Sequence, residues 1–167
     1  RGSAKITTDD NSESIIAFAN QLTILGATSG TAAGAYGGRS GNNTGTTIFC
    51  PYLISGLPTF GASSQSGSLL IQNIDSSPTD VTVDFIPGVA SPDSTSLSVP
   101  AVTLASGERL SFNMRIGSLS PLPANWFGSA KVTSTGGKIA AVSNIFNQTT
   151  TSSDPLGAYN CISPASP

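Results

Sequence analysis

The sequence predicts an all-β protein, an antiparallel β-sandwich of roughly seven strands with an immunoglobulin-like or fibronectin-like arrangement. Short β-branched runs recur between clusters of Gly, Pro, Ser and Asp, and helical periodicity is almost absent. Strands that follow one another with little helix between them are typical of two antiparallel sheets packed face to face. These two observations set the fold class.

The clearest strand runs from Arg109 to Ile116. Every second residue from Leu110 onward is apolar and the residues between are polar, which indicates a sheet with one wet face. Ser106 and Gly107 form the tight turn before it, because glycine adopts positive φ at no steric cost. Strands are expected at 47–54, 67–74, 80–86, 95–104, 109–116, 128–134 and 138–146.

Alternation also predicts which side chains fill the core. An apolar residue at every second position of the strand at 80–86 follows a turn at 75–78, and Pro87 ends the strand. Residues on one side of a strand face the same way, so the apolar sides of this strand and of the strand at 109–116 should meet. The residues expected in the core are Val81, Val83, Phe85, Leu110, Phe112 and Met114.

One series of motifs occurs twice in the chain. An ordered series at nearly constant spacing is a stricter test of a repeat than one match, although Gly-Ser-Ala-rich chains can also match by composition alone. A repeat of about 125 residues is long enough to be a whole domain. The matched segments are 2–8 with 128–134, 15–20 with 139–144, and 34–36 with 157–159, at spacings of 126, 124 and 123 residues.

The repeat divides the chain into four parts. We expect residues 1–36 to be the closing strands of a preceding or partner repeat, 37–45 a Gly/Ser/Asn linker, 46–163 a complete sandwich, and 164–167 a tail. A two-stranded hairpin is marginally stable in water. Residues 1–36 are therefore expected to complete a sandwich with strands from another chain or an upstream repeat, by strand addition. The expected partner is the protein itself.

The composition argues against several partners. Charged residues make up 10% of the chain against a typical ~25%, and the net charge is -2, so no basic field attracts nucleic acid or anionic lipid. The chain contains no run of eighteen apolar residues, so no membrane span is expected. The chain has 27 Ser and 18 Thr residues, so we expect hydroxyls, together with any sugars attached to them, to replace charge as the hydrating groups.

Two further features suit an extracellular or cell-surface protein. Asn42 and Asn147 each begin an Asn-x-Thr sequon and are candidate glycosylation sites. Cys50 and Cys161 are an even pair at the two ends of the complete unit, which favours a disulfide. Two buried free thiols are the alternative.

The sequence offers little for catalysis or metal binding. It has no His, which removes histidine-based catalysis and zinc sites that use His, so no enzyme and no cofactor are expected. Asp9, Asp10 and Glu13 offer oxygen ligands for calcium. The counterpart loop at 135–138 has no carboxylate, so a solvated hairpin tip is favoured and no metal site is predicted.

Trp126 is the candidate sugar platform. An indole beside Phe127 can stack on a sugar ring, and glycans are therefore possible partners. The favoured alternative is that a single Trp entering a strand packs into the core of a small sandwich.

Four segments carry a resemblance to a known class of proteins: Ser66–Asn73, Val81–Phe85, Trp126–Ser134 and Ala140–Asn144. They resemble β-sandwich repeats of large secreted and surface proteins of filamentous bacteria, in which a QN strand, a turn, a GSA-V-TS strand and an AAV-N strand recur in tandem. The resemblance covers about 46–160 and again 2–36. It implies an extracellular architectural role with no catalytic residues.

The sequence thus predicts a structural protein, a subunit or segment of a surface filament, sheath or stalk assembled from β-sandwich repeats by strand addition. A glycan-binding or adhesive β-sandwich module is the alternative.

Overall fold

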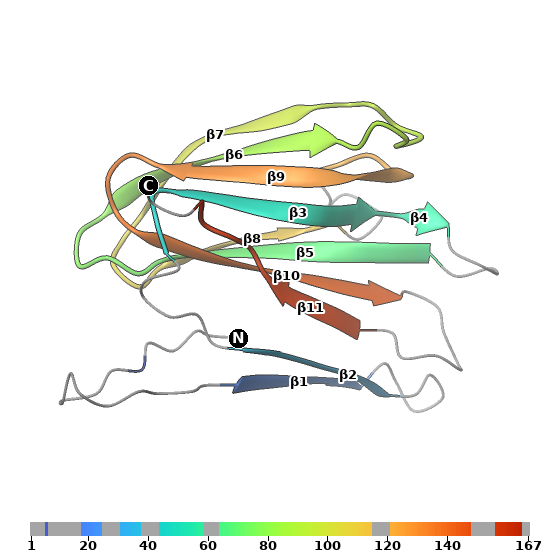
Figure 1. The fold of residues 1–167 in the computed structure, drawn as a ribbon, viewed down its shortest axis with the longest axis horizontal. Coiled ribbons are helices and arrows are strands. Elements are labelled where there is room, and N and C mark those ends of the chain that lie inside the picture. The colour runs from blue at the N-terminus through green and yellow to red at the C-terminus, as the bar shows by residue number, and fades with distance from the viewer. Residues whose placement is uncertain are drawn as a thin grey trace.

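The computed structural model describes residues 6, 18–24, 31–37, 44–58, 64–114, 121–147 and 156–164. Eight strands in these residues form two four-stranded antiparallel sheets packed as a sandwich, and a two-stranded hairpin lies beside it (Figure 1). The predicted fold class is confirmed. Within the described ranges, no helix is long and apolar enough to cross a bilayer.

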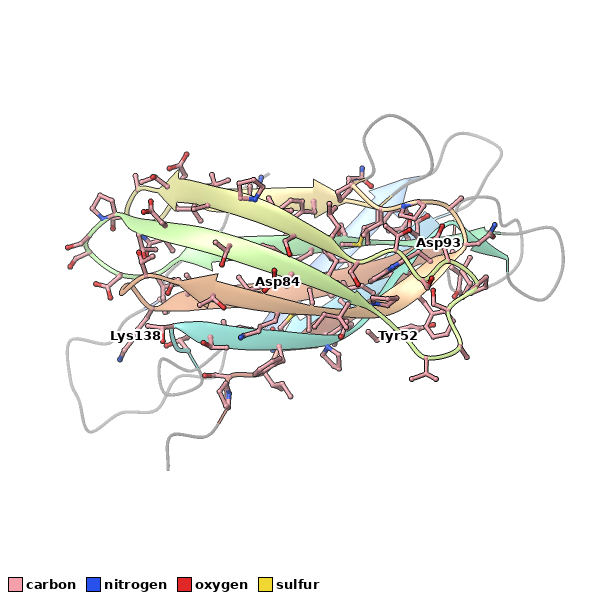
Figure 2. The ribbon with its side chains drawn as sticks, turned by 90° about the horizontal axis from the view of Figure 1, so that it is seen from above. Tyr52, Asp84, Asp93 and Lys138 are labelled. Atoms are coloured by element: carbon pink, nitrogen blue, oxygen red, sulfur yellow. A yellow bond between two sulfur atoms is a disulfide. The ribbon has the colours of Figure 1, made fainter. Side chains whose placement is uncertain are left out.

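The first sheet has the strand order β3-β9-β6-β7. In β6 and β9 buried residues alternate with partly exposed ones, as the two-residue period of a strand requires when one face covers a core. The outer face carries polar contacts as well as exposed apolar side chains such as Ile86: Ser98 Oγ donates a hydrogen bond of 2.7 Å to Asp84, which is labelled in Figure 2. The strands are β3 (Thr47–Ser55), β9 (Trp126–Ser134), β6 (Thr79–Pro87) and β7 (Leu97–Leu104).

The second sheet has the order β11-β10-β5-β8. A two-residue strand, β4 (Leu57–Pro58), continues from β3 and pairs with the start of β5, opposite Ser64 and Gln65. All of these pairings are antiparallel. The strands are β11 (Leu156–Asn160), β10 (Ile139–Asn147), β5 (Ser64–Asn73) and β8 (Arg109–Asn113).

The core lies between the two sheets and is built as alternation predicts. Phe85 packs edge-to-face against Phe112, with ring centroids 5.5 Å apart, and against Trp126 at 6.4 Å. Leu110 and Phe112 are only partly buried, because β8 is short and lies at a sheet edge. Val81, Val83, Phe85 and Met114 are fully buried.

The strand at 156–160 was not predicted. Its sequence, LGAYN, has no alternating apolar pattern, and its five residues are ordered by pairing with β10, where Ser143 lies opposite Tyr159. The sandwich therefore has one strand more than the seven expected. The strand expected at 109–116 is β8, which ends at Asn113.

The separate hairpin consists of β1 (Phe18–Ile24) and β2 (Thr31–Gly37). β2 lies beside β11, although the two strands are not in one hydrogen-bonded sheet (Figure 1). Asn160 Nδ2 donates a hydrogen bond of 2.7 Å to the Gly37 carbonyl. From the repeat, residues 1–36 were not expected to find a place on their own sandwich, yet β2 of this segment contacts β11 of the same chain. The division at 1–36, 37–45, 46–163 and 164–167 stays a prediction.

Candidate functional site

The two hairpins β1–β2 and β10–β11 have the same pairing register. Ala19 lies opposite Tyr36 in the first hairpin, and Ser143 lies opposite Tyr159 in the second. The offset is 124 residues between the first strands, from 19 to 143, and 123 residues between the second strands, from 36 to 159. These are the offsets of the sequence repeat, so the repeat extends to backbone pairing.

The second hairpin is fastened to the opposite sheet by residues 159–163, here called the C-terminal clasp. The Tyr159 hydroxyl accepts a hydrogen bond of 3.1 Å from the Tyr52 backbone N–H and donates one to the Tyr52 carbonyl. β3 changes register against β9 between Cys50 and Leu53, so the hydroxyl satisfies backbone groups at the irregularity. Burial raises the pKa of the Tyr159 phenol, which keeps its proton at neutral pH.

A disulfide between Cys50 and Cys161 is the second component of the clasp. Both residues are fully buried, their Cα atoms are 4.5 Å apart, and the predicted pairing is confirmed. Two backbone hydrogen bonds of 2.7 and 2.8 Å join Phe49 and Ile162 beside it. The Cys161 N–H also bonds to the Ala141 carbonyl of β10, so the clasp holds both sheets together.

The free sheet edges differ in their protection. β7 carries Pro100, which has no N–H to donate, and its pairing with β6 has an irregularity between Val81 and Val83. The clasp covers β3, and β8 has only five residues. β1 has seven residues, FANQLTI, with no proline, glycine or charge, and among the described strands only β2 pairs with it. The outer edge of β1 is therefore the candidate assembly site.

The position of β10 indicates what would fit that edge. β10 lies between β11 and β5; the Lys138 carbonyl accepts a bond of 3.0 Å from Ile74, just past β5, while the Ala141 carbonyl points to the clasp. The backbone N–H and C=O groups of successive residues point to opposite sides of a strand. In β10, the backbone groups of the even-numbered residues therefore point toward β5. At the 124-residue offset, Asn20 corresponds to Asn144 of β10. The backbone N–H and C=O groups of Asn20 and of the other even-numbered residues of β1 are therefore expected to point away from β2, at the outer edge of β1.

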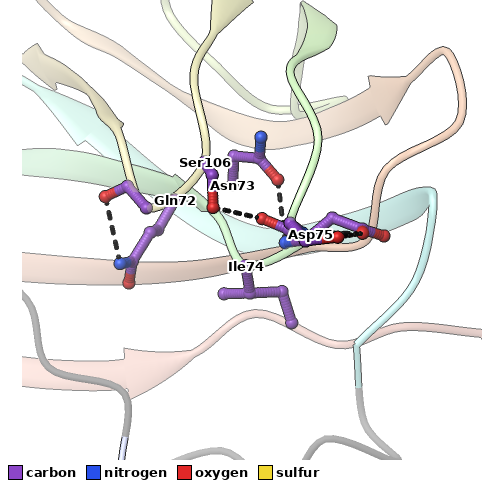
Figure 3. A pocket seen from close by; sticks show the side chains of 7 residues that line it. Gln72, Asn73, Ile74, Asp75 and Ser106 are labelled. Atoms are coloured by element: carbon purple, nitrogen blue, oxygen red, sulfur yellow. Dashed lines mark hydrogen bonds between the residues drawn. The ribbon is translucent and has the colours of Figure 1, made fainter.

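A hollow of about 170 Å³ lies where the turns after β5 and β7 meet (Figure 3). Asn73 Nδ2 donates hydrogen bonds to three carbonyls at 2.8 to 3.2 Å, and Asn73 Oδ1 accepts one of 2.9 Å from the Asp75 N–H. Ser106 Oγ donates to the Asp75 carbonyl at 2.7 Å. The hollow is lined by Gln72, Asn73, Ile74, Asp75, Ser76, Ser106 and Gly107.

The carboxylate in this hollow serves the fold. Asp75 accepts backbone hydrogen bonds from Lys138 at 3.2 Å and from Ser76 at 2.8 Å. These bonds, with that of Lys138 first, lower the pKa of the Asp75 carboxyl. Because Lys138 immediately precedes β10, Asp75 fastens the turn that leads into the second hairpin.

The remaining sequence candidates are not brought together. Trp126 is fully buried and donates a hydrogen bond of 2.8 Å from Nε1 to the Thr95 carbonyl, so the indole leaves no face for a sugar ring. Asn147 is the last residue of β10, opposite Gln65, and its glycosylation stays a prediction. Asn42 and the calcium candidates Asp9, Asp10 and Glu13 lie outside the described residues.

Comparisons with known proteins support the fold and show no family. No family model and no curated protein matches the chain. The crystal structure of Thermotoga maritima 1070 is similar, with a TM-score of 0.52 and 15% sequence identity, covering 74% of this chain and 97% of that chain. The Anabaena sensory rhodopsin transducer has a TM-score of 0.39 and 15% identity, covering 66% of this chain and 87% of that chain. The first likeness concerns the β-sandwich alone.

Proposed function

We propose that this chain is a structural protein of the extracellular space or cell surface. It serves as a subunit or segment of a filament, sheath or stalk built from β-sandwich repeats, and the repeats join by strand addition through residues 1–36. The observation that carries the proposal is the β1–β2 hairpin, which has the pairing register of a sandwich hairpin and a seven-residue edge without partner strand in the described chain. An edge of this kind is a template for another strand.

The extracellular location is supported by chemistry in the chain. The Cys50–Cys161 disulfide suits an oxidising environment, because cytosolic thiols are kept reduced. Only 10% of the residues are charged, and Ser and Thr supply the polar surface. The sequons at Asn42 and Asn147 suit the same location. The resemblance to tandem repeats of large surface proteins of filamentous bacteria agrees with this role.

The proposed partner is a further copy of the repeat, with no cofactor, metal, nucleic acid or catalytic role. A glycan-binding function is less well supported, since Trp126 was the sequence feature that suggested it and its side chain is fully buried.

The test is self-assembly of the full oxidised chain. Light scattering and negative-stain microscopy at increasing protein concentration should show regular fibres. Asn20→Pro removes an outward N–H from the β1 edge and should suppress them, because an edge strand tolerates proline but cannot then donate there. Asn20→Thr keeps the N–H and is the matched control. A chain that stays monomeric, or fibres equally abundant in Asn20→Pro, would contradict the proposal.

A further inference from the structure

We propose that the β1–β2 hairpin of one copy can replace the β10–β11 hairpin of a second copy, and that the Cys50–Cys161 disulfide prevents this exchange. The inference rests on the proposed function in taking β1–β2 as the assembling element. It adds a second acceptor that is available only after the disulfide has opened, namely the β5 edge together with the β3 irregularity of another copy of this chain.

The acceptor is defined by what β10–β11 contacts. β10 pairs with β5 along nine residues, with Asn144 opposite Ser68 and Val142 opposite Leu70. Tyr159 reaches the backbone of Tyr52 on the opposite sheet. A hairpin that replaces β10–β11 therefore needs the same register, a strand edge that can pair with β5, and a tyrosine at the position of Tyr159.

The first hairpin meets these requirements in register and sequence. Tyr36 occupies the register position of Tyr159, opposite Ala19 as Tyr159 is opposite Ser143. The seven residue pairs of β1 and β2 have no irregularity that would shift this alignment. Asn20 likewise corresponds to Asn144, the β10 residue whose side chain reaches Ser68 on β5 at 3.5 Å.

The core-facing positions also match. In β10 they are Ile139, Ala141 and Ser143, which are buried to 1% exposure or less. At the 124-residue offset the sequence has Ile15, Ala17 and Ala19. The side-chain volumes at these three positions are conserved, so the first hairpin would fill this part of the core without overpacking. The corresponding pairs are Ile15 and Ile139, Ala17 and Ala141, and Ala19 and Ser143.

The one difference among these pairs favours the incoming strand. Ser143 Oγ is buried and has no partner of good hydrogen-bond geometry among the residues that the structure describes. The Tyr159 hydroxyl lies close enough for the Ser143 side chain to lower the Tyr159 pKa, but the well-placed hydrogen bonds of Tyr159 go to the Tyr52 backbone. A buried hydroxyl that lacks a good partner is unfavourable, and Ala19 would bring none.

The disulfide distinguishes the two hairpins. Cys161 belongs to the clasp after β11, whereas the position 123 residues earlier is Gly38. With Cys161 bonded to Cys50, β11 stays attached to β3 even when its hydrogen bonds open, and its effective concentration at the acceptor stays high. Without the bond, β10–β11 can leave, and the first hairpin of another copy can enter.

The experiment uses the full chain carrying Cys50→Ala and Cys161→Ala. Size-exclusion chromatography with light scattering should show oligomers that grow with concentration. Adding Asn20→Pro should move the midpoint of association to about tenfold higher concentration, while adding Asn20→Thr should leave it in place. A folded monomer at every concentration, or oligomers unaffected by Asn20→Pro, would overturn the proposal.

Circular dichroism shows whether the cysteine-free chain folds. If it does not, wild-type protein treated with a dithiol is judged by the same criteria; the dithiol closes to a cyclic disulfide as the protein disulfide becomes two thiols. Oxidised fibres without exchange in the disulfide-free chain would refute this inference and leave the proposed function standing. Exchange without oxidised fibres would do the reverse.

Discussion

The β1–β2 and β10–β11 hairpins have one register and related sequences, but their surroundings differ. β10 has a strand on each side, and β11 with the residues after it is joined to β3 by the Tyr159 hydrogen bonds, the disulfide and two backbone hydrogen bonds. β1 pairs within the described chain only with β2. The repeat therefore accounts for the pairing within each hairpin, whereas a few residues at the end of the second copy attach that hairpin to the opposite sheet.

Of the changes considered, removal of the disulfide should reduce the stability of the β10–β11 attachment most. Cys50→Ala with Cys161→Ala should lower the free energy of unfolding by about 4–5 kcal/mol, because the bond closes a loop between residues 111 apart. Denaturant titration measures the loss. Amide exchange should rise in β10–β11 more than in β6 and β9, which serve as internal controls. A loss below about 1 kcal/mol would mean that the other clasp contacts suffice to hold the hairpin.

The tyrosine pair tests the same difference on a smaller scale. Tyr159→Phe should lower the free energy of unfolding by about 1 kcal/mol, because the hydrogen bonds to the Tyr52 backbone are lost. Tyr36→Phe is the matched control. It should leave the free energy of unfolding of the oxidised sandwich unchanged, because the Tyr52 backbone groups are already hydrogen-bonded to the Tyr159 hydroxyl. Equal losses in the two variants would remove the distinction between the hairpins.

Ser143→Ala introduces the residue that the first copy has at this position. We expect the free energy of unfolding to stay the same or rise by up to about 1 kcal/mol, because a buried hydroxyl without a good partner is removed. Ser55→Ala is the control: Ser55 Oγ is also buried but donates to the Met114 carbonyl at 3.2 Å, so its loss should destabilise. Thermal unfolding of both variants gives the comparison, and a clear loss in Ser143→Ala would show that its hydroxyl is satisfied.

Acid should give the smallest effect. The folded pKa of Asp75 is lowered, so its stabilising contribution is present above the usual carboxyl pKa of about 4 and is lost as pH falls through the folded value. Asp75→Asn should therefore have a lower melting temperature than wild type at pH 7, and the difference should shrink below about pH 4. A difference independent of pH would mean that the charge on Asp75 does not fasten the turn before β10.

Much of the sandwich could be predicted from the sequence, because alternation in the strands at 80–86 and 109–116 reports which face is buried. The disulfide followed from cysteine position. β11 could not be predicted, since its five residues owe their conformation to β10. The role of Asn73 could not be predicted either, because two of its hydrogen-bond partners, Leu104 and Ala105, lie 31 and 32 residues further along the chain.

The candidate site was predicted in part. The repeat led to the prediction that residues 1–36 are an incomplete unit, because only the closing strands occur twice, and this division stays a prediction. It could not show that β2 lies beside β11 through Asn160 and Gly37, because that contact joins equivalent positions of the two copies and has no counterpart within one copy.

The disulfide also determines how the sandwich responds to tension. When the chain is pulled from residues before Cys50 and after Cys161, the force passes between the two cysteines through the sulfur–sulfur bond. The backbone between Cys50 and Cys161 is therefore not stretched. Fully extended, that loop would measure roughly 370 Å, at about 3.3–3.6 Å per residue. While the disulfide is intact, this length cannot contribute to extension of the chain. Under tension, the segment before Cys50 would extend first, while the part of the sandwich between Cys50 and Cys161 would keep its length.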